Sequence, residues 1–217
     1  MRANEFIVEK YSRGRPVVMV DIQPAYTPVE THYEYLEDVV HFLVKQRAPV
    51  LAYVNADETG LTYDNIGDDI IPMWNNLFMD AGYNRDQLIA AMEDVQWVDK
   101  GYGYLRGWMD SGVPAKHIIA TIRAMYNQKV YDSRDLFGGD EEKRLEFLTP
   151  IADSINSEPE TLIDDALSVG WVAVDQLRKY NNCYIIGGAR EQCLAEVQLL
   201  MNAFNIRYTV IDSLVYD

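Results

Sequence analysis

The fold of this chain is decided by the stretch Cys183-Tyr-Ile-Ile-Gly-Gly-Ala-Arg-Glu-Gln-Cys193. Its apolar residues, Tyr184 to Ile186, indicate a short buried strand that ends at Gly187-Gly188. The residues that follow, 191–204, carry apolar side chains at helical spacing and predict a helix. Cys193 therefore stands where a strand runs into a helix.

The two ends of the chain repeat this alternation of strand and helix. Residues 15–21, Arg-Pro-Val-Val-Met-Val-Asp, form a continuous apolar run that predicts a buried parallel strand ending at Asp21. A helix and a second strand follow at the spacing of a β-α-β unit, so we expect a parallel sheet. The fold class predicted is a three-layer, doubly wound α/β fold with a mainly parallel sheet and helices on both faces. The elements expected at the two ends are strand 15–21, helix 31–46, strand 48–55, strand 183–186, helix 191–204 and strand 207–212.

The middle of the chain has a less regular pattern. We expect one domain over residues 1–217, with an elaborated central region at about 58–160 that includes a charged, turn-rich surface excursion at 132–159. A strand at 117–125 is predicted from its density of β-branched residues. The remaining elements expected are helices 71–81 and 85–92, strand 95–99, a helix beginning at 104, helix 141–148, strand 161–164 and helix 172–180.

Charge and cysteine content limit the function classes. The 217 residues include 19 Lys and Arg against 34 Asp and Glu, a net charge of −15, which argues against nucleic acid or an anionic membrane as a partner. No apolar run approaches the length that spans a bilayer. Two cysteines on consecutive elements give no disulfide framework. We therefore expect a soluble, cytoplasmic protein.

Cys193 has two interpretations. In the first turn of a helix, a thiol lies near the positive end of the helix dipole, which favours the nucleophilic thiolate. Cys193 also shares an apolar stripe with Val197, Leu200, Met201 and Phe204, as a packing cysteine would.

A polar partner beside the thiol would distinguish a catalytic Cys193 from a packing one. Asp21 is a candidate, because ligands of doubly wound sheets bind at the carboxyl ends of the strands, where both residues are expected. A carboxylate beside a thiol acts as a base only if a cation keeps the thiolate favoured.

These two segments carry a resemblance to a known family. Val17-Val-Met-Val-Asp21-Ile-Gln23 resembles the first strand of the isochorismatase-like cysteine hydrolases, which include the nicotinamidases and which show an Asp-x-Gln pattern there. Residues 186–193 are similar to the family's strand, glycine and nucleophile turn, and residues 205–212 to its last strand. The resemblance covers the two ends of the chain.

The resemblance implies an aspartate, lysine and cysteine triad, with Asp21 as general base and Cys193 as nucleophile toward an amide-type carbonyl. It also implies an oxyanion hole from the backbone N–H groups of residues 190–193. Arg190 replaces the small residue that is usual in the family, which would narrow or recharge the pocket. The substrate contacts implied are Gln23, Gly188, Ala189 and Arg190.

The lysine of the triad has two possible positions. The order of elements points to the end of the expected strand at 161–164, where Asp164 and Asp165 stand instead of a lysine. A second alignment selects Lys100, at the end of strand 95–99, and requires an extra strand and a long insertion before Cys193. Arg123 and Lys129 are further candidate cations.

Other sites are less well supported. His32, His41 and His117 are isolated in the sequence, so we expect no metal, and we expect no cofactor. Gly187-Gly188 before a helix also fits a weak phosphate-binding interpretation, which Glu191 opposes. The function predicted is hydrolysis of a small amide, imide or related carbonyl substrate, in a homo-oligomer such as the family commonly forms. The alternative is a catalytically degenerate member used for ligand binding or assembly.

Overall fold

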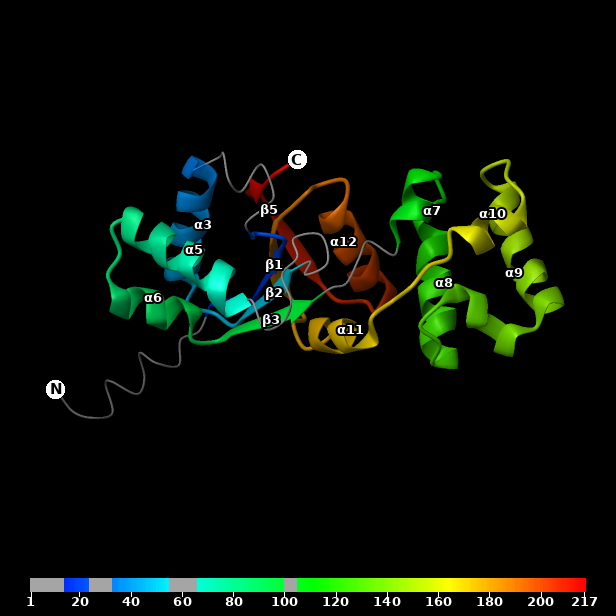
Figure 1. The fold of residues 1–217 in the computed structure, drawn as a ribbon, viewed down its shortest axis with the longest axis horizontal. Coiled ribbons are helices and arrows are strands. Elements are labelled where there is room, and N and C mark those ends of the chain that lie inside the picture. Colours follow the sequence, from blue (N-terminus) through cyan, green and yellow to red (C-terminus); the bar gives the residue numbers. More distant parts are fainter. Residues whose placement is uncertain (1–13, 24–32, 55–65, 100–104) are drawn as a thin grey trace.

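The computed structural model of the chain describes residues 14–23, 33–54, 66–99 and 105–217, and these contain a parallel sheet (Figure 1). Five strands lie in the order β3-β2-β1-β4-β5, and every neighbouring pair is parallel. Helices cover both faces, so the predicted α/β fold class is confirmed. The strands are β1 (Val17–Val20), β2 (Val50–Val54), β3 (Val95–Asp99), β4 (Cys183–Gly187) and β5 (Tyr208–Val215).

The centre of the sheet explains the continuous apolar runs. Every residue of β1 and β2 is buried, as expected for parallel strands that are covered on both faces. Val20, the last residue of β1, is in register with Tyr53 of β2 and with Gly187 of β4. The order of strands reverses between β1 and β4, so the carboxyl ends of these two strands form the switch point at which such sheets bind ligands.

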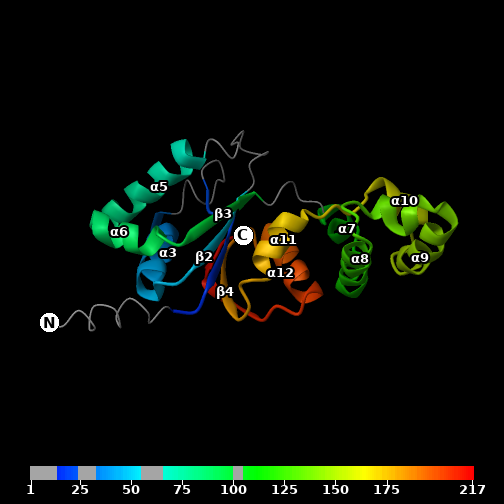
Figure 2. The same ribbon diagram turned by 90° about the horizontal axis from the view of Figure 1, so that it is seen from below.

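One face of the sheet is covered by α3 (Tyr33–Gln46), α5 (Ile66–Asp80) and α6 (Arg85–Met92) (Figure 2). The apolar residues of α3 recur at helical spacing and are buried, which is the pattern of an amphipathic helix against a sheet. Asn84 begins α6 with a capping box that includes Gln87. The buried residues of α3 on this face are Leu36, Val39, Val40 and Leu43.

The other face is covered by α11 (Trp171–Leu177) and α12 (Cys193–Ala203). Helix α12 is buried on two sides: Leu194, Val197 and Met201 pack toward the sheet, whereas Leu199 and Ala203 join a second apolar core. A helix with apolar residues all round is expected to be buried in this way.

The second core belongs to a layer of helices that lies beyond α12 (Figures 1 and 2). We call residues 105–170 the helical layer. Helix α8 packs directly on α12, and the Trp171 Nε1–H donates to the Val130 carbonyl at 2.9 Å, which joins the layer to α11. Its elements are α7 (Arg106–Asp110), α8 (Ala115–Gln128), the 3₁₀ segment η2 (Ser133–Gly139), α9 (Glu141–Asp153) and α10 (Pro159–Asp164).

Two predicted strands are wrong. Residues 117–125 lie in helix α8, whose buried residues Ile118, Thr121, Ile122 and Met125 follow a helical spacing that the β-branched density concealed. Residues 161–164 lie in α10, which begins with Pro159 at a position that favours proline. Neither segment adds a strand to the sheet.

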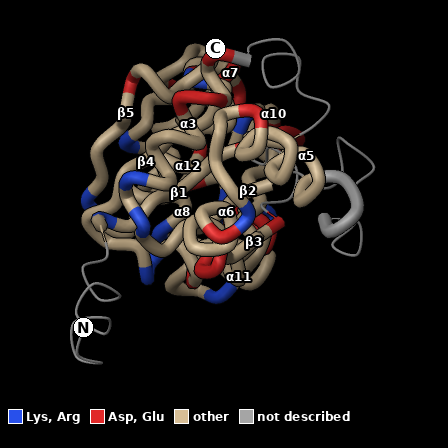
Figure 3. Tube along the Cα trace, turned by 90° about the vertical axis from the view of Figure 1, so that its left-hand side faces the viewer, with Lys and Arg blue, Asp and Glu red and all other residues tan. Residues whose placement is uncertain are grey.

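Acidic residues are not confined to one segment of the described chain. Figure 3 shows Asp and Glu in several separate parts of the trace. Within the described residues, no helix is both long and apolar enough to cross a bilayer.

Candidate functional site

Asp21 lies at the turn that ends β1, and it is fully buried. Its N–H donates to the Tyr53 carbonyl at 2.9 Å, which continues the pairing with β2, and its positive φ of 52° turns the chain out of the strand. Gln23, two residues further, is also fully buried. Burial of two polar side chains at a switch point is energetically costly without polar partners, and is typical of functional sites.

The glycines that end β4 bring this strand close to its neighbours. A Cβ atom on Gly187 would lie 2.0 Å from the Val20 carbonyl oxygen, and the φ of Gly187 is 101°. A Cβ atom on Gly188 would lie 2.6 Å from both the ring and the carbonyl oxygen of Tyr216. Glycine is therefore required at both positions, and close packing explains Gly188 without a substrate.

The turn that holds Cys193 is organised by the Ala189 carbonyl. This oxygen accepts hydrogen bonds from the N–H groups of Gln192 and Leu194, each at 3.1 Å. The peptide bond between Gly188 and Ala189 is cis. Cys193 is the first residue of α12 and is half-buried. The chain thus presents the thiol at a helix N-terminus, as the sequence predicts.

Tyr216, which the sequence did not indicate, connects the two turns. Its hydroxyl donates to the Asp21 carbonyl at 2.7 Å, and its own carbonyl accepts from the Arg190 N–H at 2.9 Å. Its N–H donates to the Gly187 carbonyl at 3.2 Å. Tyr216 therefore holds the Asp21 turn and the Cys193 turn against each other.

The Arg190 side chain is engaged by the carboxyl-terminal part of the chain. Its Nη1 lies 2.8 Å from Asp212 Oδ1, and its Nε lies 3.3 Å from Asp217 Oδ1. The first of these contacts raises the pKa of the guanidinium. The side chain that was expected to recharge the pocket is thus paired with two carboxylates.

The candidate cations differ in position. Arg123 donates to the carbonyls of Ala203 at 2.7 Å and Asn202 at 3.2 Å, at the C-terminal end of α12. An 11-residue helix is about 16 Å long, so Arg123 lies a helix length from Cys193. Lys129 caps the C-terminus of α8, further along the chain from Arg123. Neither residue is brought to Cys193.

Lys100 lies outside the described residues. Its predecessor Asp99 ends β3, and the carboxyl ends of parallel strands meet at one edge of the sheet. The strand that carries this candidate therefore ends at the same edge as β1 and β4.

Two hydrogen bonds join the first turn of α12 to the start of the helical layer. The Leu105 N–H donates to Glu196 Oε1 at 3.2 Å, and Arg106 Nη1 donates to Gln192 Oε1 at 2.7 Å. Glu196 is only 7% exposed. Arg106 is a cation that sequence reasoning missed. Its contact with Gln192 joins residues that are far apart in the sequence, and its position a few residues after Lys100 is the one hint that the sequence offers.

The two cysteines lie in different environments. Cys183, at the amino end of β4, is fully buried, and burial raises its thiol pKa to about 11. Cys193 is half-buried at the carboxyl edge. The structure therefore provides an internal reference thiol for Cys193.

Among the described residues, no three His, Cys, Asp or Glu side chains are grouped as a metal would require. Comparison of the chain with protein-family models, with curated proteins and with solved structures finds no match.

Proposed function

We propose that this protein is a cysteine hydrolase of the isochorismatase-like type that acts on a small amide, imide or related carbonyl compound. The observation that carries the proposal is that Asp21 and the Cys193 turn follow neighbouring strands at the switch point of the sheet. Tyr216 bridges the two turns by its hydroxyl and its backbone.

The order of elements supports the assignment of Lys100 as the third member. Since residues 117–125 and 161–164 are helical, β3 is the strand that directly precedes β4 in the sequence. Lys100 then follows β3 and Cys193 follows β4, and among the described residues no strand lies between these two. The alignment through Asp164 and Asp165 loses its basis, because those residues belong to the end of a helix.

In the proposed reaction, Asp21 accepts the Cys193 thiol proton while Lys100 offsets the negative charge of the pair. The thiolate sulfur forms a bond to the substrate carbonyl carbon, and the carbonyl electrons move onto oxygen. When the C–N bond breaks, Asp21 returns the proton to the leaving nitrogen, which gives a thioester. Water then attacks the thioester with Asp21 as base, and the acid and the free thiol are released.

The oxyanion donors are assigned, as the resemblance implies, to the backbone N–H groups of the turn at residues 190–193. Within residues 190–193, the N–H groups of Arg190 and Gln192 donate to the carbonyls of Tyr216 and Ala189. The first N–H groups of a helix point out of its N-terminus, toward a developing negative charge. The Arg190 side chain forms ion pairs with Asp212 and Asp217.

The pH dependence of alkylation tests the triad without knowledge of the substrate. The Cys193 alkylation rate by iodoacetamide is measured from pH 5 to 10 in a Cys183→Ala background. We expect a rate midpoint well below the value of about 8.5 for a free thiol. Asp21→Asn and Lys100→Ala should each move the midpoint by on the order of one pH unit.

Lys45→Ala is the control, because Lys45 lies in the last turn of α3 and is exposed. It should leave the midpoint unchanged. A midpoint at or above the free-thiol value in the folded wild-type background would falsify the proposal and favour a non-enzymatic role.

Hydrolysis assays complete the test. Ammonia release from nicotinamide and benzamide and opening of succinimide are the probe reactions. If the protein accelerates one of these reactions, Cys193→Ala should abolish that activity, and Asp21→Asn should lower its rate at least about 100-fold. Activity that survives Cys193→Ala would exclude the thiol mechanism.

A further inference from the structure

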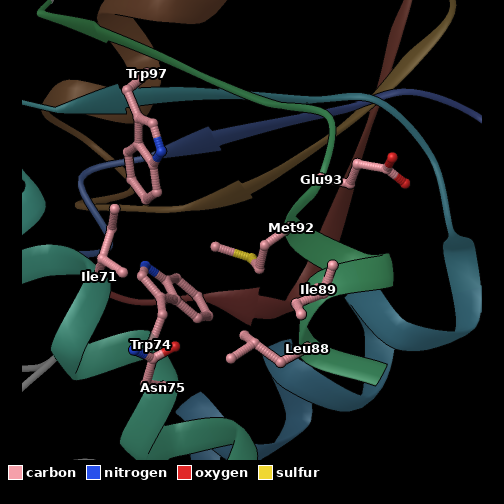
Figure 4. A pocket seen from close by; sticks show the side chains of 8 residues that line it. All are labelled: Ile71, Trp74, Asn75, Leu88, Ile89, Met92, Glu93 and Trp97. Carbon is pink, nitrogen blue, oxygen red and sulfur yellow. The ribbon is translucent and has the colours of Figure 1, made fainter. Parts of the chain in front are cut away.

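An apolar pocket lies on the α5 and α6 side of the sheet. It has a volume of about 260 Å³ and is formed between α5, α6 and the edge strand β3 (Figure 4). Its wall includes two indole rings, Trp74 from α5 and Trp97 from β3, together with Met92 from α6. The pocket shares strand β3 with the proposed Lys100, but it includes no residue of the Asp21 turn or the Cys193 turn.

The pocket is lined by a buried hydrogen-bond donor without an acceptor in the described part of the chain. Trp74 is 1% exposed, and its Nε1–H has no acceptor among the described residues. The other two indoles whose bonds are resolved behave differently: Trp108 Nε1–H donates to the Leu162 carbonyl at 3.3 Å, and Trp171 Nε1–H to the Val130 carbonyl at 2.9 Å. An unsatisfied buried donor costs about 1 to 3 kcal/mol, so its retention calls for an explanation.

The donor is directed into the pocket. Figure 4 shows the Trp74 nitrogen on the side of its ring that faces Ile71 and Trp97, where the pocket lies. Ile71 lies beside this nitrogen and is 44% exposed, so packing does not surround its side chain on every side. Ile89, at the rim, is 52% exposed.

We propose that this pocket binds a small, uncharged ring compound with one hydrogen-bond acceptor, such as an aromatic or alicyclic ketone. The apolar wall accepts the ring, and the acceptor oxygen receives the Trp74 Nε1–H. Glu93 at the edge of the pocket, and the net charge of −15, disfavour an anion. The proposal is independent of the catalytic assignment, because neither Asp21 nor Cys193 lines the pocket.

Three probes of similar shape separate the contributions of the apolar wall, the Trp74 hydrogen bond and the ligand charge. Their dissociation constants are measured by titration calorimetry on the full chain. The probes are 1-tetralone, which has a ring and an acceptor, tetralin, which lacks the acceptor, and the anion 1-naphthoate. We expect 1-tetralone to bind about tenfold more tightly than tetralin, the effect of one hydrogen bond, and 1-naphthoate to bind more weakly than both. In ¹H–¹⁵N spectra, 1-tetralone should move the indole resonance that Trp74→Phe removes.

Variants test the assignment to this pocket. Trp74→Phe keeps an aromatic ring and should abolish the preference for 1-tetralone over tetralin. Ile89→Lys, at the exposed rim, should weaken both ketone and hydrocarbon at least tenfold. Met79→Lys is the matched control, since Met79 is 60% exposed on α5 and does not line the pocket.

Equal binding of 1-tetralone and tetralin to the wild type, or an unchanged preference in Trp74→Phe, would overturn the proposal. Absence of 1-tetralone binding up to its solubility limit would overturn it as well. Binding that persists in Cys193→Ala supports this site whatever the outcome of the hydrolase tests.

Discussion

The two ends of strand β4 are built differently, although only ten residues separate their cysteines. At the amino end, Cys183 is fully buried among apolar residues and its thiol pKa is raised to about 11. At the carboxyl end, Gly187 and Gly188 lead into a polar turn and the half-buried Cys193. The same strand thus joins a position where burial suppresses reactivity to one where a helix N-terminus favours it.

The two thiols differ in their position relative to strand β4 and in their burial. Both thiols lie beside the same sheet, so apolar surroundings alone do not distinguish them. The distinguishing features are the end of the strand and the turn that follows it.

The largest expected effect is the difference in alkylation rate between the two thiols. In the folded wild type at pH 7.5, iodoacetamide should modify Cys193 on the order of 1,000-fold faster than Cys183, because Cys183 is buried and its pKa is high. Peptide mass spectrometry of quenched samples measures both rates. In denaturant the two rates should converge, and similar rates in the folded protein would remove the contrast.

The glycine turn should be the next most sensitive feature. Gly187→Ala places a Cβ atom 2.0 Å from the Val20 carbonyl oxygen at a positive φ, so we expect a loss of about 3 kcal/mol or more in the free energy of unfolding. Urea denaturation measures it. Gly82→Ala is the control: Gly82 also has a positive φ, of 80°, but open space around its Cβ position, so its loss should be about 1 kcal/mol. Equal losses would show that the close packing of β4 on β1 is unimportant.

The amino end of β4 should respond to alkaline pH. The folded-state pKa of Cys183 lies above its ordinary value of 9.0, at about 11, so the stability that the neutral thiol contributes is complete below pH 9 and is lost as the pH rises through 11. Between pH 8 and pH 10.5, the unfolding equilibrium constant of the wild type should rise on the order of tenfold more than that of Cys183→Ala. Tyrosine ionisation is common to both proteins and cancels. Parallel pH profiles would contradict the role of burial at this end.

The smallest effect is expected at the surface pair beside the Cys193 turn. Asp212→Asn removes the partner that lies 2.8 Å from Arg190 Nη1, but both side chains are substantially exposed. Exposed pairs contribute about 0 to 1 kcal/mol, so thermal unfolding at low salt should show a small decrease that 1 M salt abolishes. A larger decrease would mean that Arg190 has a structural role in holding the turn.

The sequence predicts those parts of the fold whose local pattern agrees with their tertiary surroundings. The apolar run that becomes β1 and the helical stripe of α3 are examples, since each is buried on the faces that its pattern indicates. Residues 117–125 combine β-branched density with helical spacing, so their local pattern is ambiguous. Packing of α8 on α12 favours the helix.

The candidate site divides in the same way. Asp21 and Cys193 can be found from strand ends and glycines, which are local signals. The bonds of Tyr216 to Asp21, of Glu196 to Leu105 and of Gln192 to Arg106 join residues that are distant in sequence. Such contacts depend on how the finished layers pack, and no local pattern specifies them.

Helix α12 contributes to two apolar cores at once. Excision of residues 105–170 would expose Leu199 and Ala203 to solvent and create a hydrophobic patch that promotes aggregation. The helical layer is thus no detachable module, and amide exchange along α12 should report a single cooperative opening of both cores.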